Sequence, residues 1–129
     1  MSKLGYIDIH TKKPMMRLQT RRGDYFNAVV DTGFNRQLIT SIRTALKLGA
    51  VLDTSTTVFV DVAGEKEISV IRGGLEIDWV SGWRHVSVLA YFQTEPRADI
   101  LIGTGLLYPD TLTIKFGEGI LSVDPMKYP

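Results

Sequence analysis

The chain has 129 residues, of which 44% are hydrophobic and 22% charged, and its formal net charge is +1. This length suits one hydrophobic core and is too short for two, so we expect a single domain over residues 1–129. The nearly balanced charge implies no nucleic-acid partner, and the lack of cysteine excludes disulfides and thiolate metal sites. No apolar segment resembles a secretory signal or a membrane span, so we expect a cytoplasmic protein without a membrane partner.

The first third of the chain predicts two strands followed by a helix. Strands are expected at 15–20 and 25–30, joined by a turn over 21–24 in which glycine and aspartate supply the unusual backbone angles. Thr40 or Ser41 is expected to cap a helix over 42–48. Gly49 is expected to end that helix.

The remainder of the chain predicts further β-structure. A hairpin is expected from strands at 58–63 and 67–71 around a Gly64-Glu65-Lys66 turn. The clean alternation over 75–80 indicates a strand with one buried face. Later strands are expected at 84–92, 111–116 and 119–123.

Asp31-Thr32-Gly33 is the feature of this chain that bears most directly on chemistry. It follows the apolar run 28–30, and a second apolar run, 100–102, ends in Gly103. An apolar strand, a glycine turn and a leucine-bearing segment therefore occur in each half of the chain. Two such halves can pack about a pseudo-twofold axis, each covering sheet edges of the other.

A carboxylate placed just past a buried strand, on a turn opened by glycine, is how an aspartic protease presents its catalytic acid. The reaction needs two carboxylates that share a proton, with a water between them. Neither Asp53-Thr54-Ser55 nor Asp110-Thr111-Leu112 is a second copy, because both lack the glycine. An active enzyme would therefore need two chains.

On these residues the chain resembles the retroviral-type (retropepsin-like) aspartic proteases, most of all their small prokaryotic branch. Phe34-Asn35 after the triplet is typical of that branch. The resemblance covers roughly residues 15–124, and its matching segments are 29–35, 46–49, 100–107 and 112–117. It implies an all-β, single-domain closed β-barrel of the retropepsin type, with one short α-helix and a flap hairpin, functional as a homodimer.

The resemblance also implies roles for residues at matching positions. Asp31 matches the catalytic aspartate, and Thr32 matches the threonine whose hydroxyl bonds the opposite subunit and locks the dimer. Gly33 matches the glycine that keeps the backbone close to substrate. Gly103 matches the glycine that closes the second-half turn beneath the active-site loop.

The flap and one charged pair match less closely. The hairpin around Ala63, Gly64 and Glu65 takes the flap's place by order and spacing, without the viral cluster of glycines. Viral enzymes often pair an arginine after the second-half glycine with an acid after the triplet. Thr104 and Asn35 hold those places here, so we expect a neutral dimer contact.

The implied activity is that of an aspartic endopeptidase, a peptide hydrolase acting on a peptide or protein substrate. Two Asp31 carboxylates, one per subunit, would titrate as a coupled pair and activate a water without a covalent intermediate. Substrate would lie extended between the flap and the floor of the site as an added strand. No cofactor is expected. His10 and His85 are too few and too far apart to suggest a metal site.

Other interpretations stay open at this point. The triplet could be an ordinary turn at a strand end. The fold could be kept as a catalytically inactive dimeric peptide-binding module, because fold does not determine function. A protein that acts only through its surface as an assembly partner has no positive support in the sequence.

Overall fold

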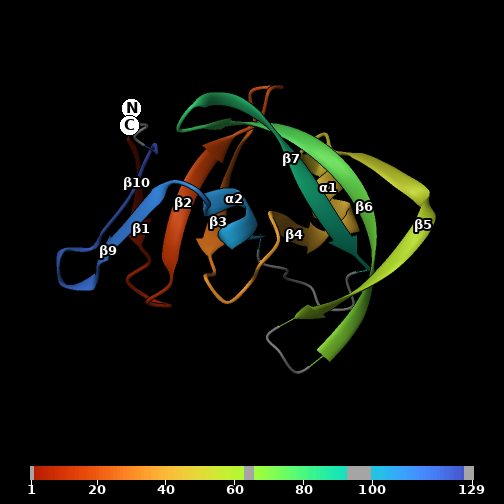
Figure 1. Ribbon diagram of the computed structural model, residues 1–129, viewed down its shortest axis with the longest axis horizontal. Helices are drawn as coiled ribbons and strands as arrows, with labels where there is room; N and C mark the ends of the chain where they lie inside the picture. Colours follow the sequence, from red (N-terminus) through yellow and green to blue (C-terminus); the bar gives the residue numbers. More distant parts are fainter. Residues whose placement is uncertain (1, 63–65, 93–99, 127–129) are drawn as a thin grey trace.

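The computed structural model describes residues 2–62, 66–92 and 100–126, and its strands form one ten-stranded sheet (Figure 1). The strands are β1 (Lys3–Ile7), β2 (Pro14–Gln19), β3 (Tyr25–Val30), β4 (Leu38–Ser41), β5 (Val51–Val62), β6 (Lys66–Trp79), β7 (Gly82–Tyr91), β8 (Leu101–Ile102), β9 (Thr111–Lys115) and β10 (Ile120–Asp124). The helical elements are α1 (Ile42–Lys47), α2 (Thr104–Leu107) and the 3₁₀ turn η1 (Phe116–Glu118). The predicted β character is confirmed, whereas the expectation of one helix missed the short α2.

The sheet is open, so the closed barrel expected from the sequence is wrong. The strand order is β5-β6-β7-β4-β8-β3-β2-β1-β10-β9, and no pairing between described residues joins the edge strands β5 and β9. Instead, the turn between β2 and β3 meets β6 through a bridge between Thr20 and Ile77. The Arg21 N–H also donates to the Glu76 carbonyl at 3.0 Å. The turn thus lies against the part of β6 beyond Gly74, where β5 no longer pairs with it.

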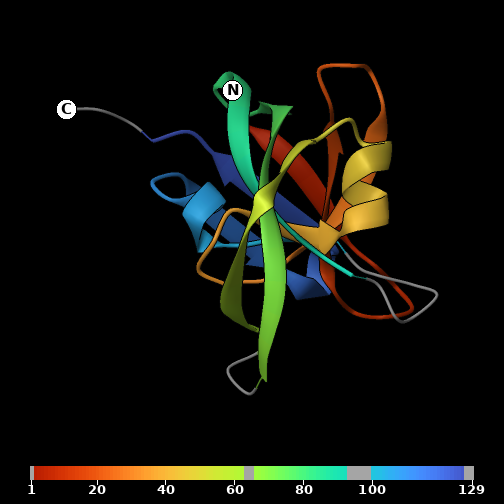
Figure 2. The same cartoon turned by 90° about the vertical axis from the view of Figure 1, so that its right-hand side faces the viewer.

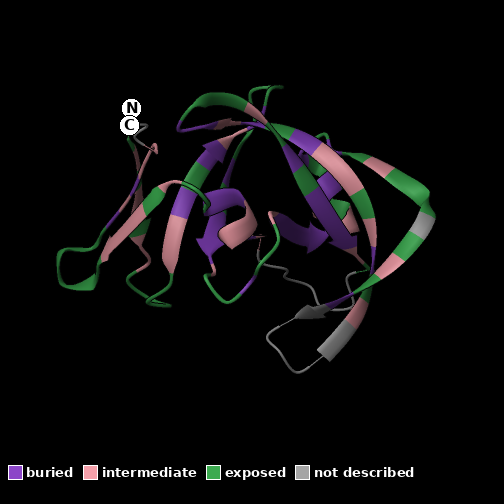
Figure 3. Ribbon diagram, viewed as in Figure 1, coloured by how far each residue is buried: buried purple, intermediate pink, exposed green. Residues whose placement is uncertain are grey.

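The main core lies on the concave side of this curled sheet. Alternate residues of β2, β3, β6 and β7 point inward, and α1 and α2 add Ala45, Leu106 and Leu107 (Figure 3). The fully buried members include Met16, Leu18, Ala28, Leu38, Ile77, Val86, Val88, Ile102, Leu106, Leu121 and Val123. The alternation predicted for 75–80 is confirmed, since Leu75, Ile77 and Trp79 are all buried.

Helix α1 begins and ends as its sequence predicts. Of the two candidate caps, Ser41 is the one used: its Oγ accepts a hydrogen bond from the Thr44 N–H at 3.1 Å. Such a bond satisfies one of the amide groups that a helix start leaves unpaired. Gly49 follows the helix with a φ of +88°, which a glycine adopts without strain. Within the described ranges, neither helix has the length and apolar character to cross a membrane.

Candidate active site

Asp31 opens the loop that joins β3 to β4, and the topology forces this loop across the end of another strand. β8 lies between the two strands that the loop connects: Val30 pairs with Ile102 in parallel, and Leu38 pairs with Ile102 in antiparallel register. The chain leaving β3 must therefore pass over the end of β8 to reach β4. This crossing lifts residues 31–37 out of the sheet.

The start of this loop is a tight turn around the Asp31 carboxylate. Oδ1 of Asp31 accepts a hydrogen bond from the Gly33 N–H at 2.9 Å. The main-chain carbonyl of Asp31 accepts another from the Phe34 N–H at 3.1 Å. The Asp31 side chain is half-buried, whereas Thr32 and Gly33 are exposed. A Cβ at Gly33 would lie 3.3 Å from Oδ1 of Asp31. The glycine therefore leaves room beside the carboxylate.

Backbone hydrogen bonds fasten the loop to the second half of the chain. The Asp31 N–H donates to the Ile102 carbonyl at 2.9 Å, and the Thr104 N–H donates to the Phe34 carbonyl at 2.8 Å. Between these contacts, a Cβ at Gly103 would lie 2.1 Å from the Phe34 carbonyl oxygen. Real Cβ atoms do not approach an oxygen so closely, so this contact requires glycine at 103. Gly103 thus lies directly beneath the loop that carries Asp31.

Gln37 anchors the far end of the loop, and no sequence pattern singled it out. Its carbonyl accepts from the Gly103 N–H at 3.1 Å, and its Oε1 accepts from the Ser87 N–H at 2.7 Å. The neighbouring Arg36 carbonyl accepts from the Gly105 N–H at 3.2 Å. These contacts engage mostly backbone atoms, which leave no signature in residue type.

Thr104 occupies the place at which viral enzymes often carry an arginine, and it contacts the loop without any charge. Its hydroxyl lies 3.4 Å from the Phe34 carbonyl, in addition to the backbone bond described above. Asn35, in the place of the viral acid, is exposed. With Thr104 and Asn35 in these two places, the contact between residue 104 and the loop is neutral.

A second hydrophobic cluster joins this loop to the long β5–β6 hairpin. Its buried members come from the loop, β4, β5, β6 and β7, in that order: Phe34, Ile39, Val60, Val70 and Leu89. Phe34, three residues after Asp31, is only 7% exposed. The inner face of the hairpin thus packs on the Asp31 loop.

The expected flap residues Ala63, Gly64 and Glu65 lie outside the described residues. The described parts of β5 and β6 pair continuously from Thr57 to Val62. They extend beyond the rest of the sheet toward the side on which the β3–β4 loop lies (Figures 1 and 2). The flap assignment stays a prediction.

The two other aspartates that precede threonine have different surroundings. Asp53 accepts hydrogen bonds from the Ser55 hydroxyl (2.6 Å) and the Ser55 N–H (3.0 Å), which hold the pKa of its carboxyl below the usual value. Asp110 accepts from Nε1 of Trp79 at 3.0 Å and from the Met126 N–H at 3.2 Å. Asp53 thus caps a local turn, and Asp110 ties the C-terminal segment to β6.

The two histidines lie apart, His10 between β1 and β2 and His85 on the exposed face of β7. Among the residues that the structure describes, no three histidine, aspartate or glutamate side chains are grouped so as to hold a metal ion.

Comparison with known proteins relates this arrangement to one fold. No protein-family model matches the chain, and no curated protein is significantly similar to it in sequence. Among solved structures, it is similar to the crystal structure of a retropepsin-like aspartic protease from Rickettsia conorii, with a TM-score of 0.69 and 13% sequence identity. The match covers 96% of this chain and 90% of that one. Across nearly its whole length, the chain therefore has the fold of the retropepsin-like aspartic proteases, as the residues around Asp31 and Gly103 predicted.

Proposed function

We propose that this protein is an aspartic endopeptidase that acts as a homodimer, with one Asp31 from each subunit. The observation that carries the proposal is the fastening of the Asp31 loop. A half-exposed carboxylate stands on a loop that crosses β8 and is bonded at both ends to residues 102–105. A rigid support of this kind keeps a reacting group in position, which is a large part of catalysis. The likeness to a retropepsin-like protease supports the same reading.

The proposed chemistry follows from placing two such carboxylates close together. Like charges at short range cannot both ionise, so the pair holds one proton between them. The ionised carboxylate takes a proton from the bound water, whose oxygen attacks the scissile carbonyl carbon, while the protonated one gives its proton to the carbonyl oxygen. The C–N bond then breaks as the amide nitrogen takes up a proton, which yields a carboxylic acid and an amine.

The residues next to Asp31 and the elements around them have parts in this scheme. Thr32 and Gly33 are exposed in the single chain, next to Asp31, where a partner subunit and a substrate would lie. The Gly33 N–H orients the carboxylate through Oδ1 of Asp31. Gly103 supports the loop from below, and the hairpin tip would cover an extended peptide from above.

The test is cleavage of a diverse peptide library at several acidic to neutral pH values. We expect the parent protein to cut internal peptide bonds, and a statine-type inhibitor to block the cutting. Asp31→Asn keeps an oxygen to accept the Gly33 N–H but cannot supply the ionised carboxylate, so the cleavage should be lost. Asp53→Asn is the matched control, because Asp53 is exposed and bonds only its own turn, and this variant should cut like the parent.

Two outcomes would contradict the proposal. Cleavage that persists in Asp31→Asn would show that another group, or a contaminant, does the chemistry. Saturable peptide binding without cleavage at any pH would instead identify a catalytically inactive binding module of the same fold.

A further inference from the structure

A cavity of about 440 Å³ lies at the end of β3 opposite to Asp31. It is bounded by the β2–β3 turn, the segment after α1, and the adjoining parts of β6 and β7. Its lining residues are Thr20, Arg21, Arg22, Leu48, Gly49, Val51, Gly74, Leu75, Glu76 and His85. Neither the proposed peptidase mechanism nor the similarity to known proteins assigns this cavity a role. Its volume suits a small organic molecule.

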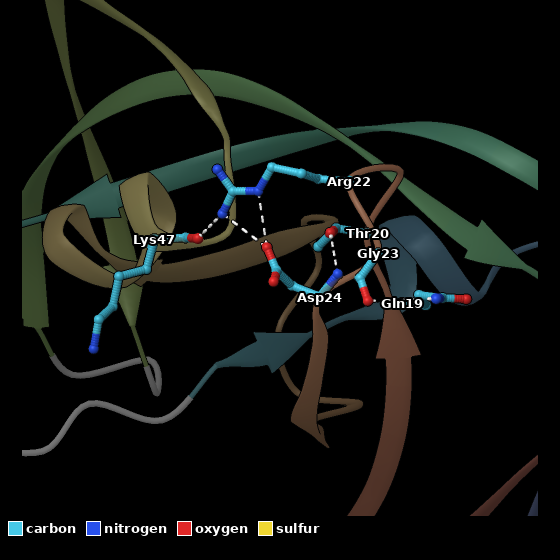
Figure 4. A network of polar contacts seen from close by, with 6 residues as sticks. All are labelled: Gln19, Thr20, Arg22, Gly23, Asp24 and Lys47. Carbon is cyan, nitrogen blue, oxygen red and sulfur yellow. Dashed lines mark hydrogen bonds and ion pairs between the residues drawn. The ribbon is translucent and has the colours of Figure 1, made fainter.

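Arg22 is held in place by polar contacts on both sides of the cavity rim. Its Nε donates to Oδ2 of Asp24 at 2.8 Å, and Nη2 also lies 2.8 Å from that oxygen. Nη2 donates further to the Lys47 carbonyl at the end of α1, so the side chain bridges the turn and the helix (Figure 4). Three contacts therefore hold the guanidinium before any ligand arrives.

This arrangement leaves Nη1 of the Arg22 guanidinium available. An arginine has five N–H groups, of which two belong to Nη1. Contacts among the described residues occupy Nε and Nη2 and none of those on Nη1. The guanidinium lies over Gly49, where a Cβ would be 3.3 Å from Nη1. A glycine at 49 thus gives Nη1 of the arginine access to the cavity.

The other arginine of the lining also has a carboxylate beside it. Arg21 lies with its guanidinium 4.9 Å from the centre of the Trp83 ring, and its Nε is 3.8 Å from Oε2 of Glu76. Each of the two arginines thus has one carboxylate partner, Asp24 for Arg22 and Glu76 for Arg21. The His85 ring packs on Gly74, where a Cβ would lie only 2.5 Å from Cε1, and it provides a further ring N–H.

The cavity also has an apolar part. Leu48 and Leu75 are buried beneath it, with 7% and 6% exposure, while Val51 at its rim is 79% exposed. A bound apolar group would cover Val51 and lie against the two leucines. Such a surface favours a ligand that is not wholly ionic.

We propose that this cavity binds a carboxylate carried on a short apolar group, with Nη1 of Arg22 as the main donor and Leu48, Leu75 and Val51 as the apolar contacts. An N–H group on a charged guanidinium gives a carboxylate oxygen a charge-assisted hydrogen bond, which is stronger than a neutral one. Glu76 disfavours a more highly charged anion, because its carboxylate faces the same space. The C-terminus of a peptide ending in an apolar residue has this chemistry, and so has a free N-acylated amino acid.

Ring resonances of the histidines provide the test, because the chain has two histidines and one of them lines the cavity. At constant pH and ionic strength, N-acetyl-leucine should shift the His85 resonances in a saturable way. His10 lies at the other end of β2 and serves as the internal control. N-acetyl-leucinamide, which lacks the carboxylate, and acetate, which lacks the apolar group, should each bind at least roughly tenfold more weakly, since each loses one of the two kinds of contact.

Two variants test the donors. Arg22→Lys and Arg21→Lys keep the charge but lose the fixed guanidinium N–H groups. Both should weaken binding of N-acetyl-leucine, Arg22→Lys by roughly tenfold or more. Arg17→Lys is the control, because Arg17 stacks on Tyr25 and does not line the cavity. If Arg22→Lys does not fold, two measurements still test carboxylate binding in the cavity. One is the comparison of the three ligands on the parent protein, and the other is binding of N-acetyl-leucine to Arg21→Lys.

Three results would overturn the proposal. One is a parallel shift of His10 and His85, which indicates a general salt effect. Another is equal binding of the acid and the amide. The last is tighter binding of inorganic phosphate than of N-acetyl-leucine, which would assign the cavity to phosphate-bearing ligands instead.

Discussion

At the scale of single residues, the position of Asp31 depends on Gly103, which has no side chain, as much as on residues that have one. Gly103 lies so close to the Phe34 carbonyl that no side chain fits between them. The same residue donates its N–H to the Gln37 carbonyl at 3.1 Å. One glycine therefore contacts the middle and the far end of the loop, and a change at 103 should move the Asp31 carboxylate without touching it.

We predict that Gly103→Ala lowers the free energy of unfolding by about 1–3 kcal/mol, the usual cost of forcing an extra group into a packed site. Gly117→Ala is the control, because a Cβ there meets no atom within 4 Å. Urea unfolding of the two variants measures the difference. Equal unfolding midpoints for Gly103→Ala and the parent would mean that the loop does not rest on this glycine.

The proximity of Asp31 and Gly103 could be predicted from the sequence, but the other contacts that support the Asp31 loop could not. Asp31 and Gly103 stand in a short pattern of residue types, so their proximity followed from spacing and resemblance. Gln37 acts through its carbonyl and through a side-chain amide that reaches the Ser87 N–H, a residue 50 positions away. No local pattern encodes a contact of that separation.

At the scale of secondary-structure elements, the β5–β6 hairpin differs from the strand that leads into Asp31. β5 is an edge strand with one neighbour, whereas β3 lies between β2 and β8. The base of the hairpin is anchored in the second hydrophobic cluster through Val60 and Val70. Protection of the hairpin should therefore decrease from this anchor toward its distal end.

We predict that backbone amides of the described residues between Thr57 and Ile71 exchange with solvent faster than those of β3. Elements that open to admit a ligand belong to the less stable parts of a fold. Hydrogen exchange followed by NMR measures both sets in one sample. Amides of β7, which has neighbours on both sides, give the internal reference. If the hairpin is as strongly protected as β3, it does not serve as a lid.

The predicted strands agree with the structure wherever alternation continues over several residues, and they differ at glycines and in very short elements. Separate strands were expected on either side of Gly73-Gly74, yet β6 runs unbroken through both. The two glycines serve close packing there: a Cβ at Gly73 would lie 2.5 Å from the Val51 carbonyl oxygen. β1, β4 and α2 were missed because segments of four or five residues carry too little periodicity.

At the scale of the whole molecule, the open sheet leaves β5 and β9 as edges. Closure could not be predicted from the sequence, because it depends on whether the edge strands β5 and β9 pair with each other. Another contact across the sheet is made instead, between Thr20 of the β2–β3 turn and β6. An open sheet with one Asp31 loop is half of the proposed site. The other half would have to come from a second copy related by a twofold axis.

We predict that dimerisation and peptidase activity are a single property that depends on Thr32. Its side chain is exposed in the isolated chain, so Thr32→Val should change the stability of the monomer by less than about 0.5 kcal/mol. In the proposed dimer its hydroxyl reaches the partner's backbone, and each group left unpaired there costs about 1–3 kcal/mol. The twofold axis makes this loss occur twice, so the dimer should weaken by well over tenfold.

Sedimentation of the parent, Thr32→Val and Thr32→Ser at matched concentrations tests this prediction together with peptide cleavage. Thr32→Ser keeps the hydroxyl, so its assembly and its activity should follow the parent. Thr32→Val should shift toward monomer and lose activity in the same concentration range, because a monomer holds one Asp31 and the chemistry requires two carboxylates. Raising the concentration should restore both properties together. A parent protein that stays monomeric at high concentration and still cuts peptides would rule out a site shared between two subunits.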